Sequence, residues 1–207
     1  MSSVAVLALT AAVVGALHSV APDHWVPFAA LARARRWRTA HTARITILCG
    51  LGHVTVSAIL GVVALVTGLK AVHAIGIRLE EHATLLLMAF GTIYTVWGLW
   101  RSFRRDPLAV MHHDHGLTEW SLFALFSLDP CVAVIPMIVA ASAGGWAAVG
   151  AVVVVYEAAT IAAMIVLVSV AVAGVRTLRF AFLDRFGDAV AGGLILTTGG
   201  VLAMLGL

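Results

Sequence analysis

Two histidines and an aspartate lie close together in an otherwise apolar stretch near the start of the chain. His18, Asp23 and His24 fall within GALHSVAPDHWVPFAALA, and the rest of this stretch suits a protein core or a lipid bilayer. An ionised aspartate at the bilayer centre costs on the order of 2.5–3.5 kcal/mol, so a polar cluster at that depth indicates a functional site. Imidazole and carboxylate groups bind divalent transition metals, and a bound cation would balance the charge of Asp23.

Pro22 lies inside this cluster and decides its geometry. An unbroken helix turns about 100° per residue, which would place Asp23 about 140° and His24 about 240° around the axis from His18. Because proline removes a backbone donor and disfavours helix at the preceding residue, we expect the helix to break there and the side chains to converge. In a purely structural alternative, His18 bonds a carbonyl of a neighbouring helix and Asp23 caps a short helix over 23–31.

His53 is the fourth candidate metal ligand. Cys49, His53 and Ser57 are spaced four residues apart, so they share one face of a helix, and Cys49 is a weaker candidate on that face. A histidine in a membrane also serves as a hydrogen-bond donor between helices, and this interpretation of His53 stays open.

Three further residues in the second half of the chain are weaker candidates for metal binding. Asp129 and Cys131 flank Pro130, and Glu157 lies beside Tyr156 in a run of valine and alanine. A carboxylate at that depth binds a cation, carries a proton, or is protonated and hydrogen-bonded across helices. We therefore expect Glu157 to be a ligand, a proton-coupling group or a structural hydrogen-bond donor.

A second group of histidines stands in the polar segment DPLAVMHHDHGLTE. It consists of His112, His113, Asp114 and His115. These ligand types suit Ni²⁺, Co²⁺, Zn²⁺ or Cu²⁺, so the segment is either a loop that captures metal or an ordinary solvated loop.

The composition places the chain among integral membrane proteins. Of its 207 residues 62% are hydrophobic and 11% are charged, and the mean hydropathy is +1.05. Six apolar runs are long enough to cross about 30 Å of hydrocarbon as helices. They cover residues 4–31 with a break at Pro22, 45–69, 83–101, 119–142, 147–173 and 188–207. We expect an all-α fold with a single transmembrane domain over residues 1–207.

The arginines gather after the first, third and fifth apolar runs. They are Arg33, Arg35, Arg36, Arg38 and Arg44, then Arg101, Arg104 and Arg105, then Arg176, Arg179 and Arg185. The positive-inside rule makes these loops cytoplasmic and both termini external, in a multi-pass protein of the plasma (inner) membrane. Aromatic residues do not interleave with the basic run in the way that binding of single-stranded nucleic acid requires, so the net charge of +3 does not indicate a nucleic-acid partner.

Two segments of the chain resemble each other. Residues 16–23, ALHSVAPD, and 124–131, ALFSLDPC, share four of eight positions. The second copy starts the fourth run, which crosses in the opposite direction to the first, so we expect an inverted 3+3 repeat. Repeat 1 covers about 1–101, the histidine-containing loop 102–118, and repeat 2 about 119–207. Matched helices broken at Pro22 and Pro130 predict a substrate site near the membrane midplane.

The pattern His18-x4-Asp23-His24, followed by Gly52-His53, resembles the signature of the nickel/cobalt transporter superfamily, including its short urease-accessory-type permeases. The resemblance implies that His18, Asp23, His24 and His53 select and move Ni²⁺ or Co²⁺. It covers the first half of the chain and extends more loosely, through LDPCVAVIP, into the second half. The chain is shorter than the eight-span permeases of that superfamily and lacks the acidic motifs of their later helices.

We therefore expect a secondary transporter, not an enzyme, that carries Ni²⁺ or Co²⁺, with Zn²⁺ and Cu²⁺ as alternatives and no permanent cofactor. The chain has no phosphate-binding loop, dinucleotide-binding or serine-hydrolase motif. Two other classes stay open. Cys49 and Cys131 would serve a membrane thiol–disulfide electron carrier of the cytochrome-biogenesis type, whereas an anion or organosulfur exporter of the sulfite-exporter type would need cationic groups in its spans. Paired glycines in 188–207 would pack within a monomer or across a homo-oligomer.

Overall fold

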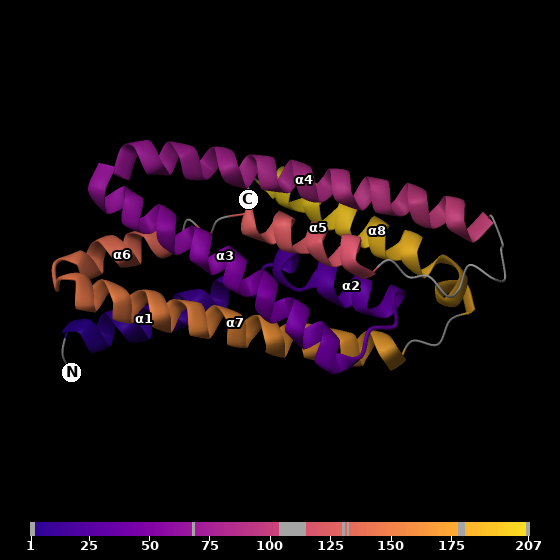
Figure 1. Cartoon of the computed structure of the whole chain (residues 1–207), viewed down its shortest axis with the longest axis horizontal. Coiled ribbons are helices and arrows are strands. Elements are labelled where there is room, and N and C mark those ends of the chain that lie inside the picture. The colour runs from indigo at the N-terminus through magenta and orange to yellow at the C-terminus, as the bar shows by residue number, and fades with distance from the viewer. Residues whose placement is uncertain are drawn as a thin grey trace.

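The computed structural model describes residues 3–67, 69–103, 115–129, 131, 133–177 and 181–205, and these residues form helices and turns without a strand (Figure 1). In chain order the elements are α1 (Ser3–His18), the 3-10 turn η1 (Pro22–His24), α2 (Val26–Ala34), α3 (Thr39–Thr67), α4 (Leu69–Phe103), α5 (His115–Ser127), α6 (Val134–Ser142), α7 (Trp146–Thr177) and α8 (Ala181–Leu205). The expected all-helical class is confirmed.

Four helical segments are long and apolar enough to cross a membrane. They are Thr39–Thr67, His82–Phe103, Trp146–Gly174 and Arg185–Leu205, and α1 with α2 forms a fifth candidate as a bent pair. The apolar run 119–142 is not one continuous helix, because it is divided between α5, with 13 residues, and α6, with 9. Neither piece reaches the roughly 20 residues that a straight crossing requires.

The break expected at Pro22 is present. Helix α1 ends at His18, the 3-10 turn begins at Pro22, and α2 leaves at an angle of 81° to α1. The connecting turn is held by backbone bonds, since the Ala21 N–H donates to His18 O and the His24 N–H donates to Ala21 O, both at 3.1 Å. The side chain of Ser19 also donates to Thr160 O at 3.2 Å, which ties the end of α1 to α7.

The long helices pack in pairs. Helix α1 lies against α7, α5 against α3, and α4 against α8. The pair α4 and α8 approaches most closely at glycines. A Cβ on Gly91 would lie 2.8 Å from Leu196 Cα, and a Cβ on Gly98 would lie 2.9 Å from Ala189 Cα. Small residues at these positions let the two backbones touch, as in many membrane helix pairs.

One end of the bundle collects arginines. Helices α2, α4 and α7 end, and α3 and α8 begin, at the right-hand end of the molecule in Figure 1. Arg35 caps α2, Arg38 precedes α3, and Arg101 lies in the last turn of α4. We call this the arginine-rich end.

Two buried apolar clusters fill the bundle. The α2 cluster includes Phe28, Leu31, Cys49, Tyr94, Leu122 and Phe126. The α6 cluster includes Cys131, Ile138, Val152 and Tyr156. In Figure 1, α6 lies to the left of the break between α1 and α2, and α2 lies to its right, so the break separates the two clusters along the long axis.

Candidate metal centre

Three histidines from separate elements meet at the break in the first helix. His18 is the last residue of α1, His24 ends η1, and His53 projects from the middle of α3. The ring centroids of His18 and His24 are 4.4 Å apart, those of His24 and His53 5.1 Å, and those of His18 and His53 5.9 Å. The bend at Pro22 produces this convergence, because a straight helix would carry His18 and His24 to different faces.

One ring nitrogen from each histidine lies within 4.8 Å of the other two. A transition metal binds imidazole nitrogen at about 2.1 Å, so two nitrogens of one ion are separated by at most about 4.2 Å. Three nitrogens spread evenly around one ion are closer still, about 3.4–3.6 Å apart, so the three rings need to close by up to about 1.4 Å to hold one ion.

The cluster is buried, and its nitrogens lack partners. His24 is 2% exposed and His53 is 1% exposed. Nε2 of His18, Nε2 of His24 and both ring nitrogens of His53 have no hydrogen-bond partner among the described residues. Buried polar atoms are almost always hydrogen-bonded, so several unsatisfied nitrogens at one point require an explanation such as a bound ion.

Asp23 lies beside the cluster, and its carboxylate is not one of the three converging ligand groups. Its Oδ1 is 3.1 Å from Nδ1 of His24. A carboxylate against one nitrogen of a metal-binding histidine fixes the ring orientation and leaves the other nitrogen for the metal. The geometry thus separates the aspartate from the histidines, which the sequence analysis had grouped as equivalent ligands.

Helix α5 forms one wall of the cluster. The ring of Phe126 packs edge-on against His24, with centroids 6.4 Å apart, and Oγ of Ser127 is buried without a hydrogen-bond partner. Gly52 of α3 lets α5 approach this closely, since a Cβ there would meet Ser127 Oγ and lie 3.0 Å from Phe123 Cε2. Phe126 and Ser127 carry no metal-ligand pattern in the sequence, although the internal repeat aligns them with His18 and Ser19.

The region of the second proline carries a different set of contacts. Sγ of Cys131 lies 2.7 Å from the hydroxyl of Tyr156, and the Cys131 N–H donates to Ser57 Oγ at 2.7 Å. Pro130 itself lies outside the described residues. Cys131 therefore belongs with α7 and the far end of α3, and it is not part of the histidine group.

Both cysteines are free thiols. Cys49 is buried in the α2 cluster and Cys131 in the α6 cluster. The backbone of Cys131 is hydrogen-bonded to Ser57. Ser57 follows Cys49 on α3 by eight residues, which corresponds to a rise of about 12 Å along the helix. The two thiols thus lie at different levels of the bundle, on opposite sides of His53.

Of the remaining sequence candidates, Asp129 lies beside the histidine group, with its backbone against the ring of His53 and its carboxylate close enough to His24 to interact with it. Asp129 and Glu157 are partly buried, while the neighbours of Glu157 on α7, Tyr156 and Thr160, face the core. His112, His113 and Asp114 lie outside the described residues. Of His115 only the backbone, which begins α5, is described.

In chemical terms the arrangement offers three buried imidazoles with one carboxylate beside them. Imidazole nitrogen suits Ni²⁺, Co²⁺, Zn²⁺ and Cu²⁺, whereas Mg²⁺ and Ca²⁺ prefer oxygen ligands. Comparison of the chain with protein-family models, with characterised proteins and with solved structures finds no match.

Proposed function

We propose that this chain is a secondary transporter that carries a divalent transition-metal cation across a membrane, with Ni²⁺ or Co²⁺ as the first candidates. The observation that supports the proposal is the meeting of three histidines, from three elements, inside a bundle of membrane-length apolar helices. Ionisable or polar groups at such depth mark substrate pathways in membrane proteins.

In this proposal His18, His24 and His53 bind the ion, and Asp23 orients His24 and offsets part of the charge. Three protein ligands leave coordination positions open, whereas structural zinc sites are closed by four. An open set of ligands favours release, because a transported ion has to bind well enough to enter and weakly enough to leave.

The metal preference follows from the ligand type. Imidazoles select borderline metals over Mg²⁺ and Ca²⁺, and the Irving–Williams order makes Cu²⁺ and Zn²⁺ competitors of Ni²⁺ and Co²⁺. The resemblance of His18-x4-Asp23-His24 and Gly52-His53 to the nickel/cobalt transporter signature places Ni²⁺ and Co²⁺ first.

The proposed architecture has six spans in two inverted halves, with α1 and α2 as the first span and α5 and α6 as the fourth. Two features support it. The contact of α1 with α7 is matched by that of α5 with α3, and α1 to α2 runs left to right in Figure 1 whereas α5 to α6 runs right to left. Rocking of such halves about a central site gives alternating access. The arginine-rich end would face the cytoplasm.

The test is metal flux into proteoliposomes that contain the full chain, measured for Ni²⁺, Co²⁺, Zn²⁺ and Mg²⁺. We expect flux of Ni²⁺ or Co²⁺ and none of Mg²⁺. His24→Ala and His53→Ala should reduce flux at least about tenfold, because removal of one of three ligands removes the site. His82→Ala, which changes an exposed histidine of α4, is the matched control. Unchanged flux in both site variants would refute the proposal.

A further inference from the structure

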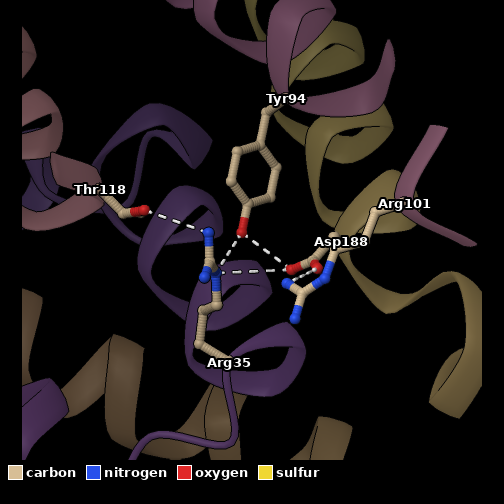
Figure 2. A network of polar contacts seen from close by, with 5 residues as sticks. All are labelled: Arg35, Tyr94, Arg101, Thr118 and Asp188. Carbon is tan, nitrogen blue, oxygen red and sulfur yellow. Dashed lines mark hydrogen bonds and ion pairs between the residues drawn. The ribbon is translucent and has the colours of Figure 1, made fainter. Parts of the chain in front are cut away.

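A buried polar network joins four helices at the arginine-rich end of the bundle (Figure 2). At its centre is Arg35, which caps α2 and is only 8% exposed. Nε of Arg35 donates to the hydroxyl of Tyr94 on α4 at 2.6 Å, and Nη2 donates to Oγ1 of Thr118 on α5 at 3.2 Å. Its Nε is also 3.5 Å from Oδ1 of Asp188 on α8.

Asp188 is shared by two arginines. The hydroxyl of Tyr94 donates to Asp188 Oδ1 at 2.9 Å, and Nη1 of Arg101 donates to Oδ2 at 3.2 Å. The guanidinium groups of Arg35 and Arg101 both lie over the ring of Trp97, at 5.0 and 5.2 Å from its centroid. The network thus connects α2 to α4, α5 and α8 through one carboxylate and one phenol.

Helix α2 connects the histidine cluster to this network. The helix has nine residues, about 14 Å in length, with His24 just before it and Arg35 at its end. Its body is packed, since Phe28 and Leu31 are 0% exposed within the α2 cluster. That cluster fills the space between the histidines and the arginine-rich end, so opening a path on that side requires α2 to move.

We propose that Arg35 and Asp188 are positioning residues for transport: their network clamps α2 against α4, α5 and α8 and keeps the histidine cluster closed toward the arginine-rich end. The proposal rests on the transport function in that it assigns the clamp to one of the two access states. A buried ion pair contributes little net stability, because the desolvation of its charges offsets much of their attraction. A recognised use of such a pair is to select one arrangement of the elements that it joins. Release of the clamp lets α2 swing away and opens the site to that side.

The two native thiols report such an opening. Cys49 lies one helical turn from His53 toward the arginine-rich end and belongs to the α2 cluster. Cys131 lies on the other side of His53, in the α6 cluster. Both are buried, at 1% and 2% exposure. Because Cys49 shares its buried cluster with α2 and Cys131 does not, we expect movement of α2 to expose Cys49 and to leave Cys131 covered.

The test is the rate at which a small maleimide modifies each thiol in the full chain, followed by mass spectrometry. Cys131→Ala and Cys49→Ala provide backgrounds with one thiol each. Tyr94→Phe removes only the hydroxyl that links Arg35 to Asp188, and Asp188→Asn removes the shared charge. Arg38→Gln, at an exposed arginine of the same end, is the control.

We expect both network variants to raise the rate at Cys49 at least about tenfold, with less than about a twofold change at Cys131 and no change in the control, since reactivity follows the population of the open state. An unchanged rate at Cys49, or an equal rise at both thiols, would overturn the proposal. Tyr94→Phe alters no packing and carries the test if Asp188→Asn fails to fold. The assay needs no metal, so its failure is distinct from a failure of the flux experiment.

Discussion

The ring nitrogens of His24 and His53 are buried polar atoms within an apolar bundle. Each buried polar group left without a partner costs about 1–3 kcal/mol, so the cluster opposes folding unless something occupies it. The carboxylate of Asp23 lies 3.1 Å from one of these nitrogens, Nδ1 of His24. The same contact leaves Nε2 of His24 free to bind a metal.

This division of roles predicts an intermediate effect for Asp23→Asn. The variant keeps an oxygen that accepts a hydrogen bond but loses the charge that orients and polarises His24. We expect the affinity for Ni²⁺ or Co²⁺ to fall about 10–100-fold, as for other carboxylates behind metal-binding histidines. Titration with a competing chelator measures the change. An unaltered affinity would contradict the role, and a loss as complete as that of His24→Ala would make Asp23 a direct ligand.

At the scale of the elements, the prolines predicted where the first and fourth apolar runs are interrupted. The conformational effect of proline is local, so the bend at Pro22 and the meeting of His18 with His24 could be predicted from their neighbours in the sequence. The contact of Arg35 with Asp188 could not be predicted, because it joins α2 to α8 across 153 positions of the chain and follows no periodic pattern. The division of 119–142 into α5 and α6 agrees with the break that the sequence predicted at Pro130, since α5 ends at Ser127 and α6 begins at Val134.

The glycines of α8 separate into two kinds, which a sequence cannot distinguish. A Cβ on Gly192 would meet Thr95 N and lie 2.8 Å from Gly91 O on α4, whereas a Cβ on Gly193 would meet nothing within 4 Å. Successive residues are about 100° apart around the helix axis, so Gly192 faces α4 and Gly193 does not. Gly192 serves the packing of α4 against α8 within the monomer.

Alanine substitutions at this pair should therefore have unequal effects. Gly192→Ala should destabilise the protein by about 1–3 kcal/mol, because the backbones of α4 and α8 have to separate. Gly193→Ala should be neutral or stabilising by up to about 1 kcal/mol, since alanine favours helix. Thermal unfolding in detergent compares the two. Equal midpoints for both variants would show that α4 and α8 do not touch at Gly192.

At the scale of the whole molecule, one end of the bundle collects several arginines. Arg35, Arg38 and Arg101 are at the first end, and the turn between α6 and α7 is at the other (Figure 1). Positive charge near helix ends favours the cytoplasmic side. The placement of all these arginines at one end agrees with the alternation of loops that the sequence predicted, and it gives the proposed orientation a structural basis.

Single cysteines at the two ends test this orientation. In a variant without Cys49 and Cys131, Arg38→Cys should react with a membrane-impermeant maleimide only in inside-out vesicles, and Ala143→Cys only in right-side-out vesicles. Both positions are exposed, so reactivity reports the side of the membrane. Labelling of both from the same side would contradict the orientation and the number of spans between them.

The central claim is that three imidazoles hold one divalent ion. Anomalous diffraction at the nickel or cobalt edge, from crystals of the metal-loaded protein, tests it most directly. The account predicts a peak at about 2.0–2.2 Å from one ring nitrogen each of His18, His24 and His53, and no such peak in His53→Ala. Metal density elsewhere in the chain with an empty histidine cluster would contradict it.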